Sequence, residues 1–300
     1  MNTKSHIPVA MVEVMNDLQI ECSDRIYDGT LGSCGHSFHM AEKLHPKNGS
    51  LVCGDVDSHA LVNAKMVLSP FIQSGLSVDF IQCNFEQAHK ESVFVEKKPN
   101  KILLDLGWSM DQFIDSQRGF SFMIDGPLDM RLEYPSQLAT ASDLVNSLSE
   151  SELIDIFETF GEEQHAREIA KKICALRKKN NIGTTFDLVQ VIESAGVRRT
   201  GKIHPATKTF QALRIAVNHE FQALFSGIPN LISLLAPGGR LCIITFHSSE
   251  DRIVKRMFES AVHSGAGVLL HKKVVVPSRN EILTNPRSRS AKIRTLQKHI

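Results

Sequence analysis

The strongest constraint on the fold is a regular alternation of short apolar runs, rich in Ile, Val and Leu, with amphipathic helical patterns. Strand-length apolar runs that alternate with helix-length segments predict a largely parallel sheet with crossover helices, which is an α/β architecture. We expect strands at about 24–28, 51–55, 77–82, 102–106 and 240–246. We expect helices at about 9–18, 36–45, 58–73 and 249–260.

The alternation stops between residues 134 and 204, where charged, helix-forming sequence continues without a strand pattern. We interpret this stretch as an inserted helical domain, which makes residues 1–133 and 205–300 a discontinuous core. An insertion after the fourth strand lies above the carboxyl ends of the strands, where open α/β sheets bind ligands. We therefore expect the insertion to help form a substrate cleft.

Length and composition indicate an ordinary globular protein of 300 residues, 42% of them hydrophobic. The sequence contains neither an apolar run of about 18 residues nor a secretory signal pattern, so we expect a cytoplasmic protein without a membrane partner. Its six cysteines are widely spaced and form no CxxC pair, so we expect neither a zinc site nor disulfides.

Positive charge is concentrated near the C-terminus. Residues 271–300 contain eight Lys or Arg against Glu281 alone, so this segment carries about +7 and the remainder about −6. The pattern predicts either a phosphate-binding segment or a solvated tail. Arg287 and Arg289 are the candidates here for contact with a nucleic acid.

A glycine-containing turn follows the first expected strand and precedes a helix, with the sequence DGTLGSCGHS at residues 28–37. Glycines in such a turn let the backbone approach a nucleotide-type cofactor, although they also occur for packing reasons. Asp55 ends the next strand about 20 positions later, where a carboxylate binds a ribose diol. We assign Asp55 to the ribose and Asp57 to a helix cap. These features fit both NAD and S-adenosylmethionine.

Two further strand ends carry candidate site residues. Phe85 follows the third strand and either lies against an adenine face or packs in the core. Asp105 ends the fourth strand at the carboxyl edge of the sheet, where a transferred group would meet its acceptor.

Long, unusual motifs occur in order along the whole chain. They include DGT at 28–30, GHS at 35–37, DLG at 105–107, RGFSF at 118–122, DGPLDMR at 125–131, HPATKTFQALR at 204–214, PGGRL at 237–241, FHS at 246–248 and NPR at 285–287. In this order they resemble the RsmH (MraW) family of ribosomal RNA methyltransferases. The resemblance implies a Rossmann-like class I S-adenosylmethionine-dependent core with an inserted helical domain. It also implies methylation of the exocyclic N4 amine of a decoding-centre cytidine in 16S rRNA of the small ribosomal subunit.

The resemblance carries the cofactor contacts of the family onto seven positions. These are Cys34, Gly35, His36, Asp55, Phe85, Asp105 and Gln112. Two departures lie nearby. Ser33 and Cys34 interrupt the glycine run, and the family's usual Gly-Val-Ser-Ser-Pro-Gln reads GWSMDQ at 107–112. These changes leave open a weakened homologue that binds cofactor or RNA, or a methyltransferase with a non-RNA substrate.

Methyl transfer depends mainly on holding the acceptor in line with the methyl group. We expect Asp105, with Ser109 and neighbouring carbonyls, to hold the hydrogens of the amine. Trp108, the only tryptophan, either stacks on the flipped cytosine or forms a wall beneath the cofactor.

Other polar residues have both substrate-binding and structural interpretations. Arg118 and Arg131 either bind phosphates or pair with nearby aspartates. Arg214 lies on a polar stripe with Thr207, Gln211 and Asn218, which faces either RNA or a buried hydrogen-bond network. His247 is either a substrate contact or structural, and Ser248 is expected to cap the following helix. Lys208 completes the expected substrate contacts, and a homodimer is a further expectation.

Overall fold

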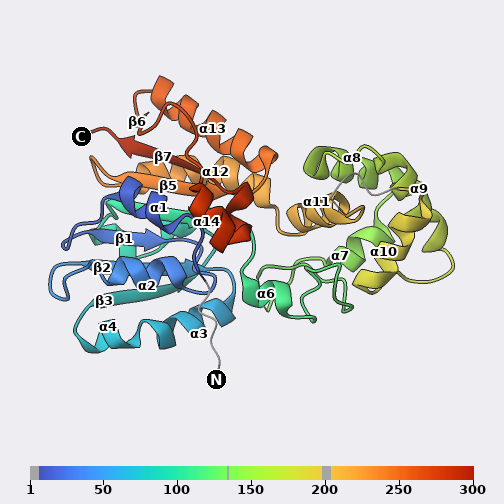
Figure 1. The fold of residues 1–300 in the computed structure, drawn as a ribbon, viewed down its shortest axis with the longest axis horizontal. Helices are drawn as coiled ribbons and strands as arrows, with labels where there is room; N and C mark the ends of the chain where they lie inside the picture. The colour runs from blue at the N-terminus through green and yellow to red at the C-terminus, as the bar shows by residue number, and fades with distance from the viewer. Residues whose placement is uncertain (1–6, 134, 198–203) are drawn as a thin grey trace. The chain divides into compact units, whose positions relative to one another are not determined.

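The computed structural model describes residues 7–133, 135–197 and 204–300. The chain divides into two compact units. Met1–Gly107 and Phe221–Ile300 form one, which we call the α/β unit, and Trp108–Glu220 forms the other, which we call the helical unit (Figure 1).

A seven-stranded sheet forms the centre of the α/β unit, in the order β3-β2-β1-β4-β5-β7-β6. The strands are β1 Arg25–Asp28, β2 Ser50–Asp55, β3 Ser77–Gln82, β4 Lys101–Asp105, β5 Arg240–Thr245, β6 Gly267–Leu269 and β7 Lys292–Lys298. Strands β1 to β5 are parallel to one another, whereas β7 is antiparallel to both β5 and β6. The five strands expected from the apolar runs are confirmed, each within one residue of its expected ends.

Helices and short 3-10 turns connect the strands of this unit. They are α1 Met11–Leu18, α2 Gly35–Ala41, α3 Ser58–Val67, α4 Ser69–Gln73, η1 Ala88–Lys90, α5 Val93–Glu96, α12 Glu220–Leu234, α13 Ser248–His263, α14 Arg279–Thr284 and η2 Pro286–Ser290. The expected helix 58–73 is divided into α3 and α4. Pro70, in the first turn of α4, has no backbone N–H to donate to the preceding turn, so one continuous helix is disfavoured.

Both faces of the sheet are covered by apolar side chains. Because side chains alternate along a strand, Ile26 and Tyr27 of β1 point to opposite faces. Ile26 belongs to a core that includes Val14 of α1 and Met40 of α2. Tyr27 belongs to the opposite core, together with Leu231 of α12. Burial on both faces explains why the central strands β4 and β5 contain continuous apolar runs in the sequence.

Part of the basic C-terminal segment belongs to the sheet. For residues 292–298 the interpretation as a solvated tail was wrong. These residues form β7, which lies between β5 and β6 and buries Ile293 and Leu296. Two of its cations bind Asp251 of α13, with Arg294 Nε 2.7 Å and Lys292 Nζ 3.2 Å from the carboxylate oxygens. The alternation of cations with apolar residues is therefore that of a strand with one buried face.

The helical unit contains α6 Met110–Ile114, α7 Ala141–Ser147, α8 Glu150–Gly161, α9 Ala166–Leu176, α10 Thr185–Ser194 and α11 Thr207–Val217. Capping boxes begin α6, α7, α8 and α10. The unit includes more of the chain than the expected insertion of residues 134–204, because flanking segments contribute side chains to its core. Phe120 and Leu128 precede the expected boundary, and Leu213 of α11 follows it. Among the described residues, no helix is both long and apolar enough to cross a membrane.

Candidate active site

The glycine-containing turn after β1 has the left-handed backbone that its sequence suggests. Gly32 has φ 49° and Cys34 has φ 67°, and Cys34 occupies the N-cap of α2. Gly35 also has a packing role, because a Cβ there would lie 2.5 Å from the Pro8 side chain. Burial, assisted by the charge of Asp28, raises the pKa of the Cys34 thiol to about 12. The thiol is therefore protonated at neutral pH, and the cofactor contact of Cys34 stays a prediction.

Asp28, at the end of β1, stabilises this turn through hydrogen bonds. Its carboxylate accepts a 2.6 Å hydrogen bond from Ser37 Oγ and a 3.3 Å bond from the Thr30 amide. Burial raises the pKa of Asp28 to about 6, against the opposing effect of these two bonds.

Asp55, at the end of β2, links that strand to the glycine-containing turn after β1. One oxygen accepts a 3.0 Å bond from the Gly32 amide, and the other accepts a 2.9 Å bond from the Asp57 amide. Burial raises the pKa of Asp55 to about 6. Asp57 caps α3 by accepting a bond from the His59 amide, as expected from the sequence.

Asp105 ends β4 and faces His36 of α2. Asp105 Oδ2 lies 3.6 Å from His36 Nδ1, while His36 Nε2 lies 3.0 Å from the Val9 carbonyl oxygen. Because a carbonyl only accepts, Nε2 carries the hydrogen of that bond and Nδ1 is directed toward Asp105. Asp105 Oδ1 is buried without a hydrogen-bond partner among the described residues. Burial, followed by the charges of Asp28 and Glu250, raises the pKa of Asp105 well above its usual range.

Two residues that the sequence interpretation missed support this strand end. Thr30 Oγ1 accepts a 2.6 Å hydrogen bond from the Asp105 amide and so connects β4 to the glycine-containing turn after β1. Glu250 is 1% exposed and acts electrostatically on Asp105. Thr30 belongs to the DGT motif, which was a signal for its role. Glu250 lies two residues after the FHS motif, which gave no signal for its role.

The helix after β5 is capped one residue earlier than expected. His247, not Ser248, is the N-cap of α13, and its Nδ1 accepts a 3.3 Å bond from the Glu250 amide. Glu250 in turn accepts a 2.9 Å bond from the Phe246 amide. The backbone of His247 is still extended, at φ −136° and ψ 162°, so the helix begins only at Ser248.

Phe85 contacts α12 closely. A Cβ placed on Gly227 would lie 2.8 Å from Phe85 Cε2, so this glycine makes room for the ring. Phe85 is partly buried against the core that contains Tyr27. This packing supports the core interpretation of Phe85, and its contact with an adenine stays a prediction.

Ser109 and Gln112, in the helical unit, form the capping box of α6. Ser109 Oγ accepts a 3.3 Å bond from the Gln112 amide, and Gln112 Oε1 accepts a 3.0 Å bond from the Ser109 amide. The structure thus gives both side chains a local structural role. The catalytic role of Ser109 and the cofactor contact of Gln112 stay predictions.

Trp108 is also in the helical unit and is 44% exposed. The guanidinium carbon of Arg214 lies 4.5 Å from the centroid of the Trp108 ring system. Arg214 is buried and forms a bidentate ion pair with Glu220, at 2.7 and 2.9 Å. Phe113 is nearly parallel to the indole, with ring centroids 6.1 Å apart.

The arginines that bracket the RGFSF and DGPLDMR motifs have structural partners. Arg118 is 4% exposed and donates to the carbonyl oxygens of Arg131 and Leu132, at 2.9 and 2.8 Å. Arg131 forms a bidentate pair with Asp129, at 2.9 and 2.7 Å. For Arg131 the pairing interpretation is thereby confirmed, and Arg118 binds backbone rather than an aspartate.

The polar stripe of α11 lies largely in a hydrogen-bond network. Gln211 donates to the Phe160 carbonyl at 3.2 Å, and Asn218 donates to the Met130 carbonyl at 2.7 Å. Lys208 donates to the Glu162 carbonyl at 2.7 Å. The network interpretation is confirmed for Gln211 and Asn218, whereas the substrate contact of Lys208 stays a prediction. In the α/β unit, by contrast, Arg287 and Arg289 of η2 are exposed.

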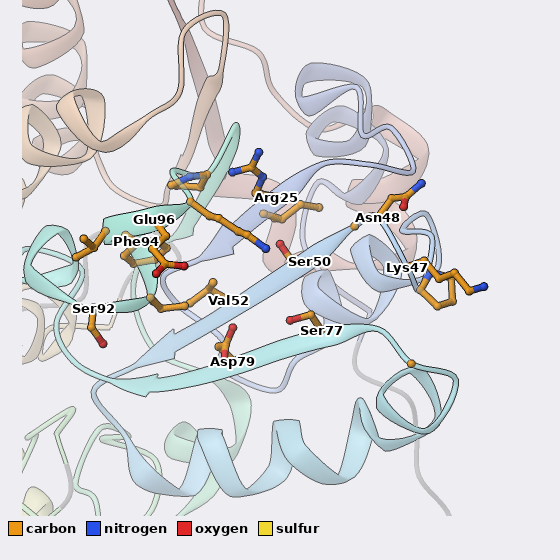
Figure 2. Close-up of a pocket in the computed structure, with 18 residues that line it drawn as sticks. Arg25, Lys47, Asn48, Ser50, Val52, Ser77, Asp79, Ser92, Phe94 and Glu96 are labelled. Carbon is orange, nitrogen blue, oxygen red and sulfur yellow. The ribbon is translucent and has the colours of Figure 1, made fainter.

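A hollow of about 810 Å³ lies elsewhere on the α/β unit (Figure 2). It is lined by Ser50 and Ser77, the first residues of β2 and β3, and by Phe94 of α5. Because α5 is only four residues long, it leaves Ser77 and Asp79 of β3 exposed. This hollow is at the amino ends of strands, away from Asp55 and Asp105, and none of the expected site residues lines it. Among the described residues, no cluster of His, Cys, Asp or Glu side chains could hold a metal ion.

Comparisons with known proteins agree over the whole chain. The model of the MraW methylase family matches residues 3–299. The chain is 42% identical over 303 residues to ribosomal RNA small subunit methyltransferase H of Coprothermobacter proteolyticus, covering 100% of this chain and 98% of that protein. It is 39% identical over 318 residues to the protein of that name from Paenibacillus sp., covering 98% and 99%. The chain therefore belongs to the MraW methylase family and is a methyltransferase that uses S-adenosylmethionine.

Proposed function

We propose that this protein methylates the exocyclic N4 amine of a cytidine in the decoding centre of 16S rRNA, within the small ribosomal subunit. The observation that carries the proposal is Asp105 at the carboxyl end of β4, a partly exposed carboxylate whose Oδ1 is buried and has no partner among the described residues. The names of the relatives and the motifs shared with the RsmH family support rRNA as the substrate.

The residues at the strand ends fit the cofactor. Asp28, Asp55 and Asp105 are carboxylates whose burial raises the pKa of each, and a cation beside them would favour their charged forms. S-Adenosylmethionine, when bound, supplies a methyl group on a sulfonium cation. Asp55 uses two of its lone-pair positions for Gly32 and Asp57, so it retains acceptor capacity for a ribose diol.

Asp105 would act on the amine of the acceptor. Its carboxylate accepts a hydrogen bond from the amine, which directs the nitrogen lone pair toward the methyl carbon. As the N–C bond forms and the S–C bond pair goes to sulfur, the nitrogen must lose a proton. A carboxylate whose pKa is raised by burial is a suitable acceptor for that proton, which then passes to solvent.

Contacts with RNA phosphates are proposed for the exposed cations of the α/β unit. Arg287 and Arg289 are adjacent on η2, and Lys272 and Lys273 are also exposed. In contrast, Lys292 and Arg294 of β7 are occupied by Asp251. The phosphate-binding part of the basic segment is therefore assigned to 272–289 rather than to its end.

The proposal is tested by transfer of a labelled methyl group from S-adenosylmethionine to small ribosomal subunits, free 16S rRNA and a protein mixture. We expect label in subunit RNA with the wild type and a loss of at least about 100-fold in kcat with Asp105→Asn. Asp79→Asn, which removes a carboxylate from the exposed face of β3, is the matched control and should be fully active. Cofactor binding without transfer to any substrate would instead identify a homologue that only binds.

A further inference from the structure

The chain enters and leaves the helical unit at two residues that share one partner. Trp108 is the first residue of this unit and Glu220 is the last. Arg214 of α11 contacts both, through its guanidinium over the indole and through a bidentate ion pair with the carboxylate. We call these three residues the clasp.

The arginine of the clasp is held rigidly. The side chains of Arg214 and Glu220 are 5% and 12% exposed, and both of their hydrogen bonds are shorter than 3.0 Å. A bidentate pair in a dry environment fixes the plane of the guanidinium as well as its position. The backbone of Arg214 is fixed as well, because its carbonyl accepts a 2.8 Å bond from the Asn218 side chain.

The tryptophan of the clasp is, by contrast, accessible. Trp108 retains 44% exposure although Arg214 and Phe113 lie against it. Arg214 lies over the indole and holds it in place, and the part of the ring that remains exposed is available to a π ligand. Its place in the chain also matters. Trp108 follows Asp105 by three residues, so the backbone keeps their Cα atoms within about 11 Å of each other.

We propose that Glu220 and Arg214 position Trp108 as the stacking surface for the target base. The inference rests on the proposed function and deepens it by assigning a base contact and its supporting residues. A base that is unstacked from RNA recovers stacking energy on an aromatic ring, and tryptophan offers the largest such surface.

The test is a double-mutant cycle on the apparent KM for small ribosomal subunits, with the KM for S-adenosylmethionine measured in parallel. Trp108→Val removes the aromatic ring, and we expect it to raise the subunit KM roughly 10-fold or more, because stacking on an aromatic side chain contributes substantially per base. Arg214→Met should raise it nearly as much. The KM for S-adenosylmethionine should change less than about 2-fold in both variants.

The cycle distinguishes positioning from a merely structural role. If Arg214 acts through Trp108, the variant carrying both substitutions should equal Trp108→Val alone. Additive effects, or an unchanged subunit KM in Trp108→Val, would overturn the inference. An equal rise of both KM values would identify Trp108 as a wall beneath the cofactor and would also overturn it.

Glu220→Gln provides a second, milder variant in case Arg214→Met fails to fold. It preserves the shape of Glu220 and removes its charge, and should shift the emission of Trp108, the only tryptophan, without altering the far-ultraviolet circular dichroism. An unshifted emission would contradict the clasp. Failure of the proposed function has a different signature, because the wild type itself would then produce no methylated cytidine.

Discussion

Replacing Asp28 by Asn should make the protein more stable at neutral pH. The buried Asp28 carboxyl has a pKa of about 6, against an ordinary value of 3.8. Between these values the unfolded chain is ionised while the folded chain keeps its proton, so stability falls as pH rises. At about 1.4 kcal/mol per pKa unit, the folded protein loses roughly 3 kcal/mol of stability by pH 7.

Asp28→Asn removes this loss because the amide does not ionise. Asp28 also contributes to the raised pKa of Asp55 and Asp105, so the substitution relieves those groups in the same direction. Urea denaturation followed by circular dichroism, from pH 4.5 to pH 7, measures the difference between variant and wild type. We expect the free energy of unfolding of the variant, relative to wild type, to rise by about 2 kcal/mol over this range.

Asp79→Asn is the control for a change of net charge, since Asp79 lies on the exposed face of β3. The free energy of unfolding of Asp79→Asn should fall between pH 4.5 and pH 7 as much as that of the wild type. A constant difference between Asp28→Asn and wild type across the whole range would refute the reasoning, because it would mean that burial does not suppress ionisation of Asp28.

Three other variants test the fold and the RNA surface. Gly119→Ala should destabilise the helical unit by about 2 kcal/mol or more in thermal denaturation, because Gly119 has φ 66° and lies against backbone. Partial burial opposes ionisation of Asp251, but Arg294 and Lys292 together outweigh it and lower the pKa of the carboxyl. The stability from these ion pairs is therefore present at neutral pH and is lost as pH falls through that lowered pKa. Asp251→Asn should therefore cost about 1–3 kcal/mol at pH 7 and less in acid. Replacing both Arg287 and Arg289 by Ala should lower the salt dependence of RNA binding by about 1.5 in logarithmic slope, and an unchanged slope would remove these residues from the interface.

The central parallel strands β2, β4 and β5 were predictable because they are buried on both faces. A run such as residues 102–104 of β4 is wholly apolar, so burial leaves a clear trace in the sequence. The antiparallel edge left no such trace. β6 is three residues long, and the alternation in β7 was obscured by Lys292, Arg294 and Lys298, which were interpreted only as charge.

The candidate site was predictable where one residue type has one usual role at a strand end. Asp57 is the clearest example, because an aspartate just before a helix is commonly its cap. Side chains with several possible partners were not predictable. Arg131 binds Asp129 and Arg118 binds two carbonyls, and their spacing alone did not distinguish these partners from RNA phosphates.

The most direct test of the central claim is to identify the methylated nucleoside. Small ribosomal subunits that lack the modification are incubated with the protein and S-adenosylmethionine carrying a trideuterated methyl group, and the RNA is digested and analysed by mass spectrometry. We predict that the label appears in cytidine methylated at N4, in the wild type and not in Asp105→Asn. Label on carbon 5 of the base, on a ribose oxygen or on ribosomal protein would contradict the account.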